Sequence, residues 1–222
     1  MKDNESCQIL AARQENPFFN RSAVHNPALF IGREELIRKI FSRIISAKPQ
    51  SISLFGERRI GKSSILSQIN SPLIQGKYIS NPEKYIFAYI DFQQFVQANP
   101  INFFKTLLKL LSLDPKSPEI RKTESNGYNE FSEFLNSCKT GEIKLVLLFD
   151  EFEKITKNPS FNVEFYAFLR SVANNFDVAF ITSSFAVLQD LCHSNQIADS
   201  PFFNIFSSFR IRPFTQAECE TL

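Results

Sequence analysis

The chain contains 222 residues, of which 25 are basic and 23 acidic, giving a formal net charge of +2. This length suits one α/β domain with a sizeable core, and the near-neutral charge gives no general reason to expect nucleic-acid binding. The four dispersed cysteines and two histidines lack the spacing of a zinc site. The sequence shows neither an apolar signal core nor the roughly 20-residue apolar run that spans a bilayer. These features predict a cytoplasmic protein without a membrane partner.

The first elements precede a glycine-rich loop. Residues 1–16 are polar and mixed in charge, which predicts a flexible N-terminal arm, and residues 17–222 are predicted to form the folded core. An apolar stripe predicts a helix from Arg33 or Glu34 to about Ala47. Taken alone, the Phe-Ile-Gly-Arg sequence that precedes this stripe is a simple helix entry.

The stretch 51–69 carries the most informative motif. Residues 51–55 are apolar and predict a buried strand, and the apolar spacing over 60–69 predicts a helix. Between them, the sequence from Gly56 to Ser63 matches G-x-x-x-x-G-K-[ST] without a mismatch. A strand, a glycine loop and a helix in this order are the arrangement that a phosphate-binding loop requires.

The residue types in this loop suit a nucleoside triphosphate. Gly56 and Gly61 allow backbone conformations closed to other residues, so that successive N–H groups turn toward the phosphates, and the N-terminus of the following helix adds positive potential. Lys62 is expected to reach the β- and γ-phosphates, and the Ser63 hydroxyl to ligate Mg²⁺. The alternative is a glycine-containing turn with an exposed lysine. The residues assigned to phosphate binding are Gly56, Glu57, Arg58, Arg59, Ile60, Gly61, Lys62, Ser63 and Ser64.

The middle of the chain predicts a second strand and two helices. Prolines and a glycine between 72 and 82 predict irregular chain, followed by a strand at 85–91. Apolar spacing predicts helices at 101–111 and 128–138, and the charged, proline-containing segment 114–125 predicts an exposed loop between them.

A second decisive stretch lies at 144–151. Its five consecutive apolar residues indicate a strand covered on both faces, which is typical of parallel sheets. The strand ends in two carboxylates. Asp150 is expected to hold Mg²⁺ through its water shell, and Glu151 to polarise the attacking water as general base. The alternative is a strand leading into a helix that merely starts with acids, which the helix dipole favours.

The last third continues the alternation of helices and strands. It predicts a helix at 161–173, a buried strand at 178–184, a helix at 186–192, a connector at 201–208 and a fifth strand at 209–214. Thr215 is then predicted to cap a helix over 216–222, with Glu218 completing a capping box. The chain stops within that helix, which predicts a domain truncated before a lid or winged-helix region.

Hydroxyl groups close the fourth predicted strand. Thr182, Ser183 or Ser184 could bond the γ-phosphate or the attacking water, while ordinary capping of the next helix is the alternative. Cys192 and His193 could be a nucleophile and its base, but neighbours in sequence rarely face each other. We therefore expect Cys192 and His193 to have structural roles.

The alternation of strands and helices predicts one doubly wound α/β sheet with helices on both faces. Ligands of such sheets bind at the carboxyl ends of the strands. Gly56, Asp150 and Thr182 all follow or close strand ends. The three candidate stretches are therefore expected to converge at one edge of the sheet.

Together these motifs resemble the AAA+ ATPases, and more closely the STAND branch of signalling ATPases. The resemblance covers about residues 17–222 and rests on Phe-Ile-Gly-Arg-Glu at 30–34, the phosphate loop, the acidic strand, the fourth strand and Ile-Arg-Pro-Phe-Thr at 211–215. It implies a three-layer P-loop NTPase fold with a five-stranded parallel sheet in the order 5-1-4-3-2, and ATP with Mg²⁺ as ligands. It also implies that the first box borders the nucleotide, with Phe30 and Ile31 near the adenine and Gly32 and Arg33 beside it.

The pattern also departs from this family. Many STAND proteins end the fourth strand in Thr-Ser-Arg, whereas this chain has Thr-Ser-Ser, and no clear arginine finger stands out, with Arg210 and Arg212 as weak candidates. The leading hypothesis is an ATP-binding switch module with slow ATP hydrolysis and a possible nucleotide-dependent homo-oligomer. The alternatives are a scaffold that holds nucleotide with little hydrolysis, and a DNA-associated ATPase of the origin-recognition type, which the charge disfavours. The acidic pair also disfavours a small-molecule kinase.

Overall fold

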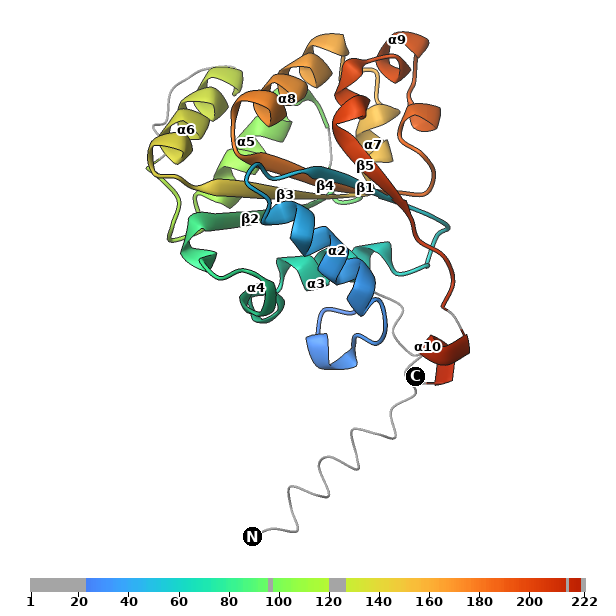
Figure 1. Cartoon of the computed structure of the whole chain (residues 1–222). Helices are drawn as coiled ribbons and strands as arrows, with labels where there is room; N and C mark the ends of the chain where they lie inside the picture. Colours follow the sequence, from blue (N-terminus) through green and yellow to red (C-terminus); the bar gives the residue numbers. More distant parts are fainter. Residues whose placement is uncertain (1–22, 96–97, 120–126, 215, 221–222) are drawn as a thin grey trace.

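Five parallel strands form one sheet at the centre of the molecule (Figure 1). The computed structural model describes residues 23–95, 98–119, 127–214 and 216–220. The strands are β1 (Ser51–Phe55), β2 (Tyr85–Asp91), β3 (Lys144–Asp150), β4 (Val178–Ser184) and β5 (Phe206–Arg210). Their order is β2-β3-β4-β1-β5, which is the predicted 5-1-4-3-2 read from the opposite edge. The predicted fold class is therefore confirmed.

Helices cover both faces of the sheet (Figure 1). One face carries α2 (Glu34–Ile44), α3 (Lys62–Asn70) and α4 (Pro72–Tyr78), and the other carries α5 (Pro100–Leu111), α6 (Tyr128–Thr140), α7 (Glu153–Thr156) and α8 (Val163–Asn175). Short helices α9 (Asn195–Ala198) and α10 (Gln216–Glu220) follow. None of the helices in the described ranges combines the length and the apolar character that crossing a membrane requires.

Two hydrophobic cores lie on opposite sides of the sheet because successive side chains of a strand point to opposite faces. In β3, Val146 and Leu148 belong to the core under α2 and α3, whereas Leu145, Leu147 and Phe149 belong to the core under α5, α6 and α8. This explains why the strand reads as an uninterrupted apolar run.

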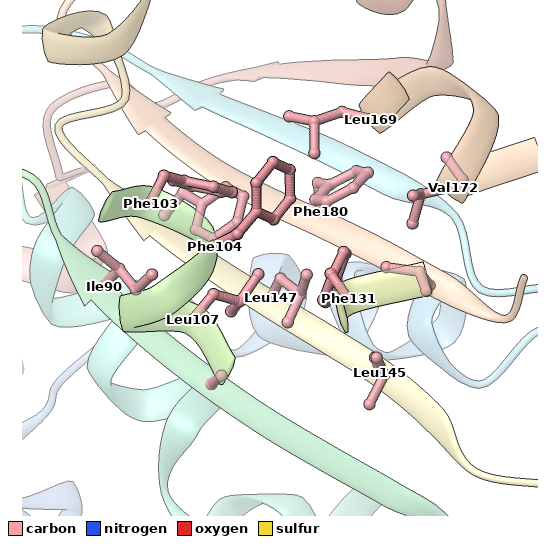
Figure 2. Close-up of a cluster of buried hydrophobic side chains, with 14 of the residues drawn as sticks. Ile90, Phe103, Phe104, Leu107, Phe131, Leu145, Leu147, Leu169, Val172 and Phe180 are labelled. Atoms are coloured by element: carbon pink, nitrogen blue, oxygen red, sulfur yellow. The ribbon is translucent and has the colours of Figure 1, made fainter. Parts of the chain in front are cut away.

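The second of these cores is rich in phenylalanine (Figure 2). The ring centroids of Phe103 and Phe149 lie 5.6 Å apart at an interplanar angle of 71°, and those of Phe103 and Phe165 lie 5.2 Å apart at 89°. Edge-to-face pairs of this kind contribute about 0.5–1.5 kcal/mol each beyond the burial of their area. They join β3 to α5 and α8 and so fix the strand that carries Asp150.

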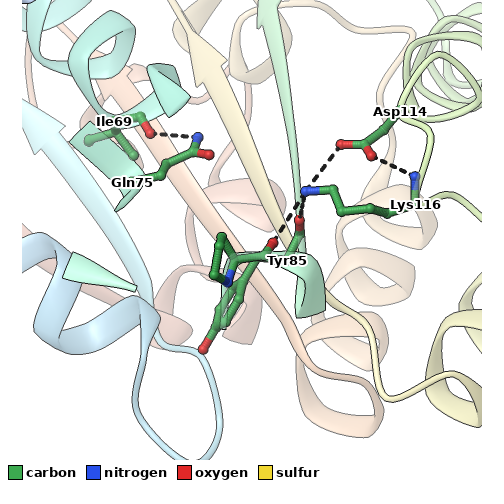
Figure 3. A network of polar contacts seen from close by, with 6 residues as sticks. Ile69, Gln75, Tyr85, Asp114 and Lys116 are labelled. Carbon is green, nitrogen blue, oxygen red and sulfur yellow. Dashed lines mark hydrogen bonds and ion pairs between the residues drawn. The ribbon is translucent and has the colours of Figure 1, made fainter. Parts of the chain in front are cut away.

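Helix α4 corrects the prediction of irregular chain after residue 72. Pro72 occupies the first turn, where its missing N–H costs no hydrogen bond. The ring of Tyr78 stacks on Phe41 of α2 at 4.7 Å, and Gln75 Nε2 donates to the carbonyl of Ile69 at 3.1 Å (Figure 3). Tertiary packing therefore holds a short helix whose composition suggests a turn.

Two further predictions near the C-terminus need correction. The expected helix at 186–192 is only a 3₁₀ turn at Gln189–Leu191. The fifth strand lies at Phe206–Arg210 rather than 209–214, because it pairs with the whole of β1 and β1 ends at Phe55. The predicted N-terminal arm and the capping residue Thr215 lie outside the described residues.

A lysine fastens the loop that follows α5 to the beginning of β2 (Figure 3). Lys116 Nζ donates to the carbonyl of Tyr85 and, at 3.3 Å, to that of Pro82, and it lies 3.6 Å from the carboxylate of Asp114. The described part of the predicted loop, residues 114–119, is indeed irregular. This contact lies at the amino end of β2, the opposite end from the predicted site.

Candidate nucleotide site

The glycine loop joins β1 to α3 at the carboxyl edge of the sheet. A Cβ atom at Gly56 would lie 2.7 Å from the carbonyl oxygen of Ile211, so only glycine lets the two backbones pass. Gly61 has φ of +100° and immediately precedes α3, and a Cβ there would meet open space. The first glycine therefore serves a close approach and the second a left-handed turn.

The loop presents unsatisfied donors at its open side. Within the described chain, no backbone carbonyl accepts a hydrogen bond from the N–H groups of Gly61, Lys62, Ser63 or Ser64. Such groups at the start of a nine-residue helix carry partial positive charge and bind anions. The loop therefore fits the phosphates of a nucleotide.

Lys62 is enclosed by this loop, with only 5% of its surface exposed. Its Nζ donates to the carbonyl oxygens of Gly56 and Glu57, both at 2.8 Å. Burial lowers the pKa of the ammonium, while the charges of Glu151, Glu153 and Asp150 oppose that shift.

Asp150 ends β3 and is 3% exposed. Both of its carboxylate oxygens accept hydrogen bonds. The Ser183 hydroxyl and, at 3.1 Å, the backbone N–H of Glu151 donate to Oδ1, and the Tyr89 hydroxyl donates to Oδ2 at 2.8 Å. Donors from β2 and β4 thus hold the carboxylate from both sides, and neither Tyr89 nor this use of Ser183 was predicted.

Glu151 follows Asp150 in a left-handed backbone conformation, with φ of 55°. Its N–H donates both to Asp150 Oδ1 and to Ser183 Oγ, each at 3.1 Å. Left-handed non-glycine residues cost about 1–3 kcal/mol and occur where surrounding contacts enforce them, often at functional sites. The tight turn separates the half-buried Glu151 side chain from the buried Asp150.

A third carboxylate, Glu153, also belongs to this region and was not predicted. It is 4% exposed, and within the described chain its Oε2 has no hydrogen-bond partner. Burial and the charge of Glu151 raise its pKa, while the N–H groups of Glu153 itself and Phe185 and the charge of Lys62 oppose the shift. The only signal in the sequence was an acid three residues after Asp150, which also suits the first turn of any helix.

The hydroxyls at the end of β4 do not act together. Ser183 faces Asp150, whereas Thr182 shares the sheet face of Phe180 and the phenylalanine-rich core because strand side chains alternate. Of the three hydroxyls predicted as candidates for the γ-phosphate or the attacking water, the structure thus places Ser183 beside Asp150 and Thr182 on the opposite face of the sheet. The Thr182 hydroxyl is fully buried without a partner among the described residues, and Ser184 Oγ donates to the carbonyl of Ala186 at 2.6 Å.

The predicted base-binding box lies against the segment that follows β5. The Arg33 guanidinium sits 4.3 Å from the ring centre of Phe214 and donates to the carbonyl of Arg212 at 2.6 Å. Ile211 in the same segment donates its N–H to the carbonyl of Phe55 at 2.7 Å. Residues 211–214 therefore bridge the box and the phosphate loop, and the Arg33 side chain contacts this bridge.

A second connection joins the start of the described chain to α3. The N–H of Val24 donates to Ser64 Oγ at 3.0 Å, His25 Nδ1 lies 2.8 Å from Ser67 Oγ, and Gln68 Nε2 donates to the carbonyl of Val24 at 2.9 Å. Phe30 and Ile31 follow and are half-buried, Phe30 against the α2–α3 core. The box is thus attached to the helix that starts at Lys62.

Cys192 and His193 show the expected structural roles. The Cys192 thiol donates to the carbonyl of Leu188 at 3.3 Å, and His193 Nδ1 lies 2.9 Å from the carbonyl of Thr156. Burial raises the pKa of the Cys192 thiol to about 11. A thiol with this pKa is a poor nucleophile at neutral pH.

Solved structures similar to this chain include two ORC proteins and a Walker-type ATPase. The ORC2 protein of Aeropyrum pernix, in ADPNP-ADP complexes, superposes with a TM-score of 0.69 at 13% identity, covering 94% of this chain and 54% of that one. A Walker-type ATPase of Pyrococcus abyssi superposes with a TM-score of 0.62 at 18% identity, covering 90% of this chain and 59% of that one. For A. pernix ORC1 in complex with DNA, the TM-score is 0.63 at 11% identity, covering 88% of this chain and 49% of that one. These identities show a shared fold, and the chain spans about half of each length.

No curated protein sequence matches this chain. The sequence model of the family described as novel STAND NTPase 2 matches residues 46–222, which include the phosphate loop and the acidic strand. The match begins after the box at 30–34 and extends over most of the chain. On this evidence the chain belongs to the novel STAND NTPase 2 family of P-loop ATPases.

Proposed function

We propose that this chain is a nucleotide-dependent switch module that binds ATP with Mg²⁺ and hydrolyses it slowly. One observation carries the proposal. The Lys62 ammonium lies buried in a loop whose N–H groups at 61–64 have no backbone acceptor among the described residues, and Asp150 closes β3 at the same carboxyl edge of the parallel sheet, with Glu151 directly after it. A triphosphate offers both the negative charge that the loop needs and a scissile bond for the acids.

In this proposal the chain's own groups bind and orient the reactants. The N–H groups of residues 61–64 bind phosphate oxygens, and Lys62 exchanges its two carbonyl partners for the β- and γ-phosphates. The Ser63 hydroxyl and Asp150 would hold Mg²⁺, which neutralises charge on the phosphates when bound. Glu151 accepts a proton from the water that attacks the γ-phosphorus, while the bond between the γ-phosphorus and the β–γ bridging oxygen breaks.

Two substitutions separate binding from hydrolysis. Lys62→Ala should abolish saturable binding of Mg-ATP in isothermal calorimetry. Glu151→Gln should keep binding but lower turnover roughly 10²- to 10⁴-fold, which corresponds to about 3–5 kcal/mol of barrier. Lys77→Ala and Glu164→Gln, both on exposed helix positions away from the loop, serve as matched controls. Absence of saturable binding by the unmodified chain would refute the proposal.

A nucleotide-binding scaffold is the second candidate. Its support is the end of β4, where Ser184 stands in place of an arginine and its hydroxyl is used by Ala186. A single-turnover chase with radiolabelled ATP distinguishes the two, because a scaffold keeps bound ATP intact for hours. Light scattering with and without ATP tests whether the chain forms a nucleotide-dependent homo-oligomer. A mobility shift with duplex DNA at several salt concentrations tests DNA as a partner.

A further inference from the structure

We propose that Tyr89 is a positioning residue that orients Asp150 and thereby sets the affinity of the site for a divalent metal ion. The inference rests on the proposed Mg-ATP function and adds a residue from β2, a strand that neither the phosphate loop nor the acidic motif includes. The role is one of positioning because Tyr89 acts through Asp150.

The register of the sheet brings the two side chains together. Asp91 of β2 lies opposite Asp150 of β3, and Tyr89 lies opposite Leu148. Tyr89 and Asp150 are therefore diagonal neighbours on one face, a spacing that aromatic side chains bridge. The phenol reaches Asp150 Oδ2 and donates to it at 2.8 Å.

The phenol supplies the only donor that the described chain gives to this oxygen. The Ser183 hydroxyl and the Glu151 N–H both donate to the other oxygen, Oδ1. Because Asp150 is 3% exposed, removing the phenolic hydroxyl leaves Oδ2 buried without a donor. The carboxylate then loses the contact that fixes the rotation of its plane, and a metal or its water shell meets a poorly oriented ligand.

A purely hydrophobic role for Tyr89 would not need the hydroxyl. Its ring packs beside the α2–α3 core, where phenylalanine would fill the same space. Burial first, and then the charge of Asp150, raise the pKa of Tyr89 far above its ordinary value, so the phenol stays a neutral donor throughout the physiological range.

The test is a Mg²⁺ titration of nucleotide binding by Tyr89→Phe. Calorimetry with AMP-PNP in EDTA should give an affinity within about twofold of the unmodified chain, because the loop N–H groups and Lys62 are untouched. The Mg²⁺ concentration that gives half of the metal-dependent gain in affinity should rise about 10- to 100-fold, as loss of groups that orient metal ligands typically does. Tyr85→Phe is the matched control, since Tyr85 lies at the far end of the same strand and is 7% exposed.

A double-variant cycle supplies the second measurement. In an Asp150→Asn background, which removes the charged ligand, Tyr89→Phe should change the Mg²⁺ dependence less than twofold, because Tyr89 has no carboxylate left to orient. An unchanged Mg²⁺ requirement in Tyr89→Phe, with thermal unfolding like that of Tyr85→Phe, would overturn the inference. Failure of the unmodified chain to bind Mg-nucleotide would instead refute the proposed function, so the two failures are distinguishable.

Discussion

At the scale of single residues, the site combines one buried ammonium group, that of Lys62, with three carboxylates at the end of β3 and the start of α7. Asp150 accepts three hydrogen bonds, Glu151 is held by a strained turn, and Glu153 is buried with one oxygen unpartnered among the described residues. Similar side chains therefore have different environments, and differences of this kind are how proteins assign separate roles to neighbouring acids.

Glu153 should make folding stability depend on pH. Because its pKa in the folded chain is raised above 4.5, its favourable contribution is complete below that value and is lost as the pH rises through the folded-state pKa. The Glu153→Gln variant has no carboxyl group to titrate at this position. The difference between its free energy of unfolding and that of the unmodified chain should therefore shift in favour of the variant as the pH rises above about 4.5, by about 1.4 kcal/mol for each pKa unit by which folding raises the pKa of Glu153. Urea denaturation between pH 4 and 8 measures this difference.

Glu164→Gln provides the comparison for that experiment, because Glu164 is an exposed acid in the first turn of α8. Its curve should follow that of the unmodified chain across the whole range. Parallel curves for Glu153→Gln and the unmodified chain would show that Glu153 is not destabilised by burial.

At the scale of elements, glycines have opposite roles in two helices. Gly76 lies inside α4 in an ordinary helical conformation, and a Cβ added there would meet open space. Gly127 precedes α6 with φ of +83°, and a Cβ there would lie 2.8 Å from Cβ of Phe104. Gly76 therefore lowers the stability of α4 without any packing need for a glycine, whereas Gly127 is required where α6 begins beside α5.

These environments predict substitutions of opposite sign. Gly76→Ala should stabilise the chain by about 0.5–1 kcal/mol, because alanine loses less backbone entropy in a helix. Gly127→Ala should destabilise it by about 1–3 kcal/mol through the left-handed conformation and the contact with Phe104. Chemical denaturation measures both. A stabilising Gly127→Ala would contradict the packing described at the start of α6.

At the scale of the whole molecule, the nucleotide site is held together by segments distant in sequence. Residues 211–214 bridge the box around Arg33 to the loop at Gly56, and Val24 bonds to Ser64 in α3. A ligand in the loop is therefore expected to stabilise the first and last described segments together with the sheet.

Binding should accordingly raise the temperature of unfolding. At 100 times its dissociation constant, Mg-ATP adds about 2.7 kcal/mol, which for a chain of this size is roughly 5–10 °C. Differential scanning fluorimetry measures the shift. Lys62→Ala should show none, whereas Lys77→Ala should shift like the unmodified chain. An equal shift in both variants would place the ligand elsewhere.

Local patterns were sufficient for the elements that build the site. The phosphate loop between a strand and a helix, and the apolar run ending in Asp150, are properties of adjacent residues, and both appear at the predicted positions. The family match over residues 46–222 agrees with them. The strand order followed from resemblance to a family, because strand and helix alternation alone leaves the order open.

By itself, the sequence therefore determined the P-loop ATPase class and the positions of the segments proposed to carry its chemistry. Only the tertiary structure decided that Tyr89 and Ser183 hold opposite oxygens of Asp150, that Thr182 faces the other core, and that Arg33 contacts residues 211–214. The physical reason is that these contacts join separate strands and segments. Their partners follow from sheet register, strand-face alternation and chain crossing, which no spacing within a single element encodes.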